Sequence, residues 1–318
     1  MDDAEALAAQ RVGTTIGAWR IESVLGVGAM GAVFVGIRSD GERAALKVLH
    51  PEYSEVPAIR KRFLREGPLE SALAIMAPLC EGIPRILEGG VAEDGAAYLA
   101  MELLVGETVS DRVARLGTLS VEDALALADQ VLAVLVIAHR HSVIHRDLKP
   151  ENLHIGANGL VKVLDFGIAR ILDPLPEGVG VLPEKTATRT GTTLGTCDYM
   201  APEQATGLID QIDARTDLFG LGATLFHLLS GRTIHGDLPG SRLLIAAATE
   251  SAPSLSSVVS DVPVDVCAVV DRSLAFVKTQ RYPDAITMRA DVRALSQKKT
   301  PPYVQAIAEG RVQAGARL

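Results

Sequence analysis

Three polar residues of one short segment, Asp147, Lys149 and Asn152, have the types and the spacing that phosphoryl transfer requires. An aspartate can orient an attacking hydroxyl and accept its proton, a lysine can neutralise a phosphate, and amide or carboxylate oxygens can bind Mg²⁺. Asp165, in the segment Asp165-Phe166-Gly167, offers a second metal ligand. Any one of these residues alone is better explained as a turn former or a solvated charge. Their combination in this order predicts phosphoryl transfer, which depends mainly on positioning and charge neutralisation.

A glycine-rich stretch, residues 25–33, could bring backbone N–H groups close to the phosphates of a nucleotide. It lies between two runs that read as strands, residues 19–25 and 32–37. A glycine pattern by itself also fits a plain hairpin turn. Lys47 weakens that alternative, because it follows at the right distance in an apolar run, residues 44–49, that reads as a strand partly buried on both faces.

These motifs together resemble those of the eukaryotic-like (Hanks-type) serine/threonine protein kinases, and in particular the bacterial members of that family. The resemblance covers residues 17–297. It implies an α+β, bilobal protein-kinase fold with ATP in the cleft: an antiparallel β small lobe with one helix (17–102), a hinge near residue 103, and a mainly α-helical large lobe (105–297). Residues 1–16 are expected to be an N-terminal tail, and residues 298–318 a linker followed by a short helix.

The resemblance also implies which residues contact the phosphates of ATP. In the family, the lysine that Lys47 matches contacts the α- and β-phosphates and pairs with a helix glutamate, which Glu66 matches. Gly67-Pro68 follows directly, and a proline inside a helix costs about 3 kcal/mol, so the helix should kink or end there. Glu70, one helical turn further on, is the alternative partner.

The adenine is expected to lie against a strand and hinge, residues 97–104. Met101 matches the gatekeeper, and backbone groups of Glu102 and Leu104 would bind the base. His154 stands where the family usually has an aliphatic floor; its ring could stack on a purine or could be a satisfied, half-buried histidine. Besides Lys47, the expected ATP-binding residues are Leu25, Gly26, Val27, Gly28, Ala29, Met30, Gly31, Val33, Ala45, Met101, Glu102, Leu104 and His154.

The segment from residue 195 to 203 resembles the family's substrate-docking loop. Thr196 would hydrogen-bond Asp147 and Lys149, an arrangement typical of kinases that phosphorylate serine or threonine. The resemblance pairs Glu203 with a buried Arg281 and makes Asp217 the helix-start aspartate that holds the catalytic segment's backbone. A surface charge for Arg281 and a favourable first-turn charge for Asp217 are the alternatives.

Threonines gather in the long segment before this loop, at positions 186, 188, 190, 192 and 193. They could be solvated loop residues only. In the family, however, an arginine such as Arg146 binds a phosphate on this loop through charge-assisted bonds. Thr188 and Thr190 match the threonines that bacterial relatives modify, so autophosphorylation, in trans within a transient dimer, is expected.

Composition is consistent with a soluble, cytoplasmic enzyme. Of 318 residues, 48% are hydrophobic, and the net charge of −8 argues against a nucleic-acid partner. Three separated cysteines fit no metal-ligand spacing, and no apolar run reaches the roughly 18 residues that span a bilayer. Whether the chain is a fragment of a longer membrane-anchored receptor or a short form is open.

Three functions are compatible with parts of this pattern. A serine/threonine protein kinase that uses ATP with Mg²⁺ or Mn²⁺ on protein substrates is favoured by the complete set of Lys47, Asp147, Asn152 and Asp165. A pseudokinase or scaffold that binds nucleotide or partners with little turnover is the alternative, suggested by the Gly67-Pro68 interruption. A small-molecule phosphotransferase is disfavoured because the docking segment is present.

Overall fold

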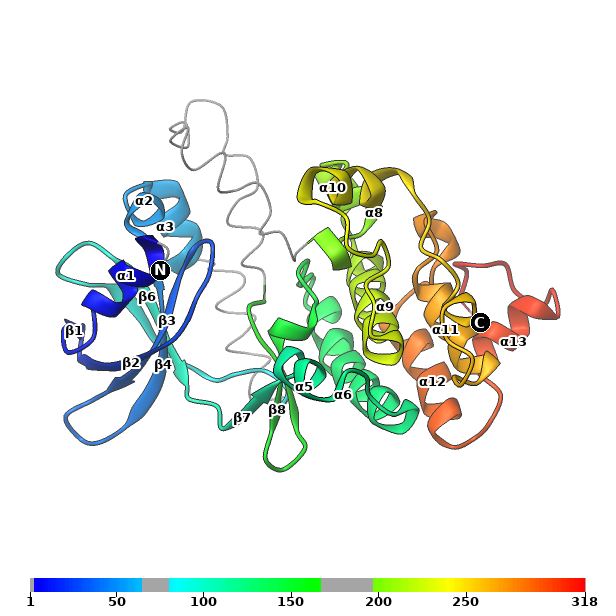
Figure 1. Ribbon diagram of the computed structural model, residues 1–318, viewed down its shortest axis with the longest axis horizontal. Coiled ribbons are helices and arrows are strands. Elements are labelled where there is room, and N and C mark those ends of the chain that lie inside the picture. The colour runs from blue at the N-terminus through cyan, green and yellow to red at the C-terminus, as the bar shows by residue number, and fades with distance from the viewer. Residues whose placement is uncertain (1–2, 65–79, 167–196, 318) are drawn as a thin grey trace. The chain divides into compact units, whose positions relative to one another are not determined.

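The computed structural model describes residues 3–64, 80–166 and 197–317. The chain forms two compact units, and the boundary between them lies between Val105 and Gly106, close to the hinge that the sequence predicts. Figure 1 labels most of the helices and strands of both units. Within the described stretches, no helix combines the length and the apolar character needed to cross a membrane.

The first unit is built on a six-stranded sheet in the order β1-β2-β3-β4-β6-β5, with every pairing antiparallel (Figure 1). Apolar and β-branched residues dominate its central strands, which suits a pleated surface covered on both sides. The expected strands around the glycines and at Lys47 are all present. The strands are β1 (Thr15–Ile16), β2 (Trp19–Val27), β3 (Gly31–Ile37), β4 (Arg43–Leu49), β5 (Ile86–Val91) and β6 (Ala97–Glu102).

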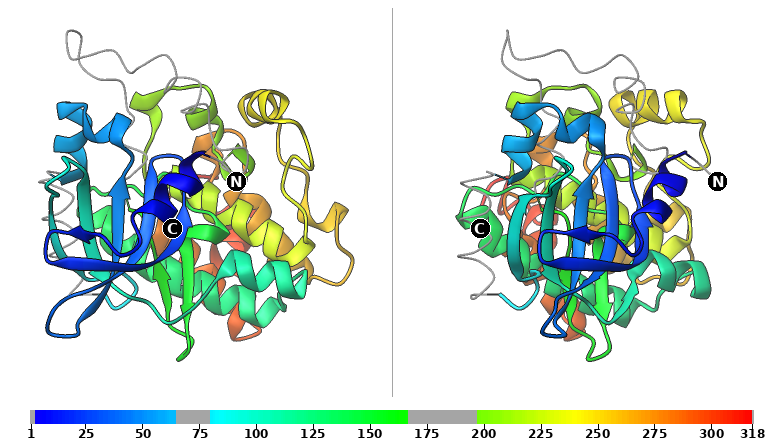
Figure 2. Two further views of the ribbon diagram at one scale, coloured as in Figure 1. Left: turned by 60° about the vertical axis from the view of Figure 1, so that its left-hand side comes forward. Right: turned by 90° about the vertical axis from the view of Figure 1, so that its left-hand side faces the viewer.

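One face of this sheet carries an apolar cluster centred on Trp19, Phe34 and Leu46. Helix α1 (Asp3–Gln10) packs against β2, and it adds Ala8 to the cluster, while β1 adds Ile16. Figures 1 and 2 show α1 lying against the strands. Residues 3–16, for which the sequence suggested a tail, therefore include a helix and a strand that pack on this unit through Ala8 and Ile16, while Leu7 and Val12 stay exposed.

Two further helices follow β4 in this unit. Helix α2 (Pro51–Ser54) begins with a proline at its first position, where the missing N–H costs nothing. Helix α3 (Pro57–Leu64) buries Ile59 and Phe63.

The second unit begins with a three-stranded sheet, β7 (Gly106–Thr108), β8 (Leu153–Gly156) and β9 (Val161–Val163). Helix α5 (Val109–Leu116) starts at a capping box made by Thr108 and Asp111. Helix α6 (Val121–Arg140) has a buried apolar face, and the side chain of Ser120 caps its N-terminus by accepting from the N–H of Asp123. The helix α9 (Ala214–Ser230) packs against α6 and is buried over most of its length.

The remaining helices surround α6 and α9. Helix α12 packs along α6, and the two lie side by side in Figures 1 and 2. The helices are α8 (Pro202–Ala205), α10 (Gly240–Thr249), α11 (Val264–Ser273) and α12 (Ala285–Ser296), with short 3-10 turns η2 (Pro150–Asn152), η4 (Cys197–Tyr199), η5 (Ile209–Gln211), η6 (Leu255–Ser257) and η7 (Lys278–Gln280).

The short helix expected near the C-terminus is α13 (Pro302–Ala308). Its Tyr303 is fully buried, and the backbone N–H groups of Tyr303 and Val304 donate to the carboxylate of Asp291 on α12. Helix α13 is thus bonded to α12.

Candidate active site

The predicted catalytic residues of the segment between α6 and β8 come together. The Nζ atom of Lys149 lies 3.0 Å from Oδ2 of Asp147. Asn152 donates from Nδ2 to the same Oδ2 at 2.9 Å and to the backbone oxygen of Asp147 at 2.7 Å. One carboxylate is therefore oriented by a cation and an amide.

The backbone of this segment is held by Asp217, near the start of α9. Its Oδ1 accepts from the N–H of Arg146 at 2.8 Å, and its Oδ2 accepts from the N–H of His145 at 2.9 Å. Asp217 is 1% exposed, so two charge-assisted bonds act away from water. These are the two bonds that the resemblance implies for Asp217.

Two residues of the site adopt left-handed backbone conformations that non-glycine residues rarely occupy. Arg146 has φ = 69° and Asp165 has φ = 60°. Such conformations cost on the order of 1–3 kcal/mol and persist where surrounding contacts over-determine them. At Arg146 these contacts are its N–H bond to Asp217 and its carbonyl oxygen, which accepts from Nε2 of Gln204 at 2.7 Å.

A fully buried histidine links the catalytic segment to the segment of Asp165. Nε2 of His145 lies 2.6 Å from the carbonyl oxygen of Leu164, so this nitrogen carries the proton. Nδ1 is then the acceptor for the N–H of Asp147 at 3.2 Å. The ring packs edge-on against Phe166, with ring centroids 4.7 Å apart. The position of Asp147 is thereby tied to the residues on either side of Asp165.

The two expected metal ligands fit a magnesium ion that completes its shell with phosphate and water. Both hydrogen bonds of the Asn152 amide use Nδ2, which leaves Oδ1 as the ligand atom. Asn152 and Asp165 supply the hard oxygens that Mg²⁺ prefers, and it commonly takes only one or two protein carboxylates. Among the described residues, no group of three or more histidine, cysteine, aspartate or glutamate side chains forms an all-protein metal cage.

In the first unit, the glycine-rich stretch is the end of β2, the start of β3 and the turn between them. The N–H of Gly28 donates to the oxygen of Gly31 at 2.8 Å, which closes the turn. A Cβ atom at Gly31 would lie 2.2 Å from the backbone oxygen of Val48, so only glycine fits there. The two strands expected on either side of the glycines are joined by a tight turn, and the glycine at position 31 has a packing reason.

The predicted strand lysine lies on the same sheet. Lys47 is 8% exposed, and it pairs in register with Val33 of β3. Ala45, two residues earlier on β4, lies on the same face as Lys47 because side chains alternate along a strand. These expected nucleotide contacts thus share one face, opposite the face that bears Phe34 and Leu46.

The expected hinge residues lie at the end of β6. Met101 pairs in register with Ala45. Glu102 is bonded to Arg85 twice: its N–H donates to the Arg85 oxygen at 2.9 Å, and its Oε1 accepts from the Arg85 N–H at 2.7 Å. The side chain of Glu102 therefore has a structural role that the sequence did not reveal, and Leu104 follows the end of the strand.

His154 lies on β8 between Thr108 and Lys162. Burial lowers the pKa of its imidazole; the charge of Asp111 acts in the opposite direction, and Lys162 adds to the lowering. Within the part of the chain that the structure describes, no hydrogen bond to the ring is found. The ring of His154 therefore has no hydrogen-bond partner among the described residues that would make it a satisfied histidine. Stacking of the ring on a purine stays a prediction.

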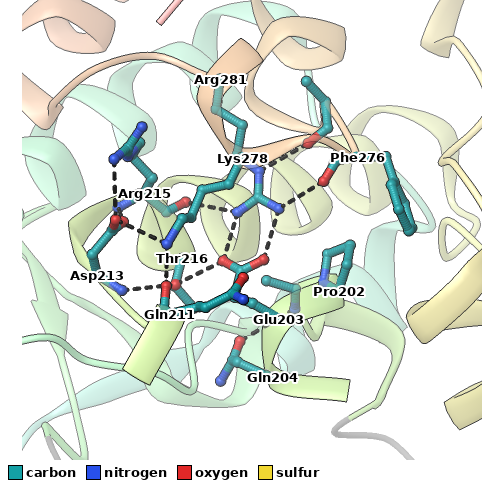
Figure 3. Close-up of polar contacts among 12 residues, drawn as sticks. Pro202, Glu203, Gln204, Gln211, Asp213, Arg215, Thr216, Phe276, Lys278 and Arg281 are labelled. Carbon is teal, nitrogen blue, oxygen red and sulfur yellow. Dashed lines mark hydrogen bonds and ion pairs between the residues drawn. The ribbon is translucent and has the colours of Figure 1, made fainter. Parts of the chain in front are cut away.

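The pair of Glu203 and Arg281 is present as the resemblance implied (Figure 3). Arg281 is fully buried, and its NH1 and NH2 groups donate to the two carboxylate oxygens of Glu203 at 2.8 and 2.9 Å. Thr216 of α9 donates to Oε1 of Glu203 at 2.8 Å. Burial raises the pKa of Glu203, but the hydrogen bonds and charge of Arg281 outweigh it, and the net pKa is lowered.

Five predicted residues lie outside the described part of the chain: Glu66, its alternative Glu70, Thr188, Thr190 and Thr196. Their assignments remain predictions.

The sequence interpretation missed several residues around the site. Nε2 of His139, in the last turn of α6, lies 2.8 Å from Oδ2 of Asp217, and the hydroxyl of Tyr199 lies 2.6 Å from Nδ1 of His227. The position of His139, six residues before His145 at a helix end, is a signal that could have been used. The bond from Gln204 to a backbone oxygen had no signal in the sequence.

Comparison with known proteins agrees with this geometry. The family described as "Protein kinase domain" matches residues 19–281. Serine/threonine-protein kinase PknB of Mycobacterium leprae is 32% identical over 289 residues, which cover 89% of this chain and 44% of that protein. Serine/threonine-protein kinase PknA of Mycobacterium tuberculosis is 32% identical over 305 residues, covering 92% of this chain and 66% of that protein.

A relative from another genus, serine/threonine-protein kinase pkn3 of Myxococcus xanthus, is 37% identical over 226 residues, covering 69% of this chain and 39% of that protein. The chain thus spans less than two thirds of the length of these curated relatives.

Proposed function

Because the chain belongs to the protein kinase domain family, we propose that it is a serine/threonine protein kinase that transfers the γ-phosphate of ATP to serine or threonine hydroxyls of proteins. The observation that carries this proposal is the arrangement of Lys149 and Asn152 around the carboxylate of Asp147. The names of the relatives, all serine/threonine-protein kinases, support the class of acceptor.

The reaction needs an oriented hydroxyl and a stabilised phosphoryl group. The acceptor oxygen bonds to the γ-phosphorus, the bond from that phosphorus to the β–γ bridging oxygen breaks, ADP leaves, and the hydroxyl proton passes to Asp147. Lys149, held at 3.0 Å from Asp147, neutralises charge on the transferred group. Asn152 and Asp165 would hold Mg²⁺, or Mn²⁺ in its place. The ion would neutralise charge on the β- and γ-phosphates.

The first unit is proposed to bind the nucleotide. The turn between β2 and β3 offers backbone N–H groups to phosphates, and Lys47 offers a cation on the same sheet. Met101 and the backbone of Glu102 and Leu104 would contact the adenine. Glu66, with Glu70 as the alternative, would orient Lys47.

Protein substrates are the expected partners, and one of them is proposed to be a second copy of this chain. Phosphorylation in trans at Thr188 and Thr190 would place phosphate where Arg146 could bind it through charge-assisted hydrogen bonds. Cytoplasmic residence stays a prediction from the sequence.

The direct test is incorporation of labelled phosphate from ATP and Mg²⁺ into the purified chain and a generic protein substrate. Asp147→Asn should abolish transfer. Asp261→Asn is a matched control, because Asp261 is exposed and bonds only to the neighbouring Ser260 hydroxyl in the described structure. Transfer that persists in Asp147→Asn would refute the assigned base, whereas ATP binding without any transfer by the wild type would indicate a scaffold. Peptide mapping that finds phosphate only away from Thr188 and Thr190 would refute those two sites.

A further inference from the structure

One residue holds the turn between β2 and β3 at two points. His50 directly follows β4, and its backbone N–H donates to the oxygen of Met30 at 2.9 Å. Its ring nitrogen Nε2 lies 2.9 Å from the oxygen of Gly28. A carbonyl oxygen can only accept, so Nε2 carries the proton and donates. The side chain and the backbone of His50 therefore bind two carbonyl groups of the same turn.

These bonds fix more than the oxygens that accept them. The carbonyl group of Gly28 and the N–H group of Ala29 belong to one planar, trans peptide unit and point in opposite directions. When the His50 ring orients the Gly28 oxygen, it also orients the Ala29 N–H. That N–H is one of the turn's groups proposed to face the phosphates of a nucleotide.

His50 is itself anchored. Its carbonyl oxygen accepts from the N–H groups of Tyr53 and Ser54 at 3.0 Å each, at the start of α2. The hydroxyl of Ser54 accepts from the N–H of Ala97 at 3.1 Å, at the start of β6. A series of hydrogen bonds therefore links β6, α2, His50 and the turn between β2 and β3.

We propose that His50 is a positioning residue of the nucleotide site. Its ring holds the Gly28–Ala29 peptide in the orientation that presents the Ala29 N–H to a phosphate. This inference rests on the proposed function, because it needs the turn to bind ATP. His50 is not a catalytic residue, since it acts through the turn.

Two substitutions of similar size separate this role from simple packing. In glutamine, Nε2 is as many bonds from Cβ as Nε2 of histidine, so His50→Gln can still donate to the Gly28 oxygen. In His50→Asn, the amide nitrogen reaches only the position of Nδ1. A cavity of about 480 Å³ adjoins His50, and it leaves room for either side chain.

The test compares wild type, His50→Gln, His50→Asn and His50→Ala by the KM for ATP, kcat and the melting temperature. Loss of one hydrogen bond that positions a phosphate-binding group should raise the KM for ATP about 3- to 10-fold in His50→Asn and His50→Ala. His50→Gln should stay within about twofold of the wild type, and the KM for the protein substrate should not change. Glu22→Ala, which removes an ion pair with Arg43 on the same sheet, is the control and should leave the KM for ATP unchanged.

Equal KM values for ATP in His50→Gln and His50→Asn, or an unchanged KM for ATP in His50→Ala, would overturn the role proposed for His50. If the wild type is active in the same assay, the proposed function is unaffected by that result. A wild type that binds no ATP would overturn both. Hydrogen exchange at the Ala29 amide without nucleotide gives a further readout: altered exchange in His50→Asn but not in His50→Gln is the expected result, and identical exchange in both contradicts the inference.

Discussion

The backbone around Asp147 in the second unit and the turn between β2 and β3 in the first unit (the glycine turn) are held in different ways. Around Asp147, side chains from three separate elements fix the backbone: His139 and Asp217 act together from α6 and α9, and Gln204 acts from α8. Around the glycine turn, the described bonds are the Gly28–Gly31 closure and the two from His50.

The difference indicates a division of roles. The residues proposed to carry out the chemistry lie beside a strained backbone at Arg146 and Asp165, and such strain persists only where many contacts hold it. The turn between β2 and β3, which is proposed to admit and release a nucleotide, needs fewer contacts. Substitutions in the second unit should therefore affect stability and kcat strongly, and those at the turn should affect ATP affinity.

The largest effect is expected for Arg281→Met. It leaves the buried Glu203 carboxylate without its bidentate partner, which should lower the free energy of unfolding by roughly 3–5 kcal/mol. Urea denaturation measures this loss. The double variant Glu203→Leu/Arg281→Met should lose less than Arg281→Met alone, because it removes the unpaired charge. A double variant that is less stable than Arg281→Met would contradict this explanation.

The next effect concerns the anchor of the catalytic segment. In Asp217→Asn the amide can accept only one of the two N–H bonds, so kcat should fall about 10- to 100-fold, as expected for loss of a hydrogen bond to a charged group. The KM for ATP should change little. Asp213→Asn is the matched control, because Asp213 is the N-cap of the same helix and asparagine caps a helix as well as aspartate. An equal fall in kcat for both variants would show that the helix, not the anchor, matters.

A smaller effect is expected in the first unit. Gly31→Ala forces a methyl group against the Val48 oxygen and should cost about 1–3 kcal/mol of stability through overpacking. Gly26→Ala meets no atom within 4 Å of the added Cβ and should stay within about 0.5 kcal/mol of the wild type. Thermal unfolding of the two variants checks this, and equal losses would refute the close contact at Gly31.

The smallest effect is a pH dependence. The pKa of Glu203 is lower in the folded state than in the unfolded state, so its contribution to stability is present above the unfolded pKa and is lost as pH falls through the folded pKa. Unfolding measured from pH 6 down to pH 3 should show this loss in the wild type. In Arg281→Met the same pH range should show a weaker loss, and an equal loss would contradict the assignment.

The sequence predicted what depends on residue types at short spacing. Asp147, Lys149 and Asn152 are close in the chain, so their meeting around one carboxylate followed from the motif. The pair of Glu203 and Arg281 is separated by 78 positions, and it was predictable only because the family resemblance supplied the partner.

Contacts to backbone groups could not be predicted in this way. His50 and Gln204 bind carbonyl oxygens, which every residue has, so no side chain in the sequence marks the partner. The packing of helix α1 could not be predicted in this way either, because the burial of Ala8 depends on the sheet that it covers.

We propose that Asp147 performs the chemistry while residues of the first unit bind the nucleotide. One experiment tests it most directly: the rate of phosphate transfer and the dissociation constant for ATP, both measured on Asp147→Asn and on the wild type. We predict that transfer falls about 10²- to 10⁴-fold, as expected for loss of a general base, while ATP affinity stays within about threefold. Loss of ATP binding in parallel with transfer, or transfer near the wild-type rate, would contradict the claim.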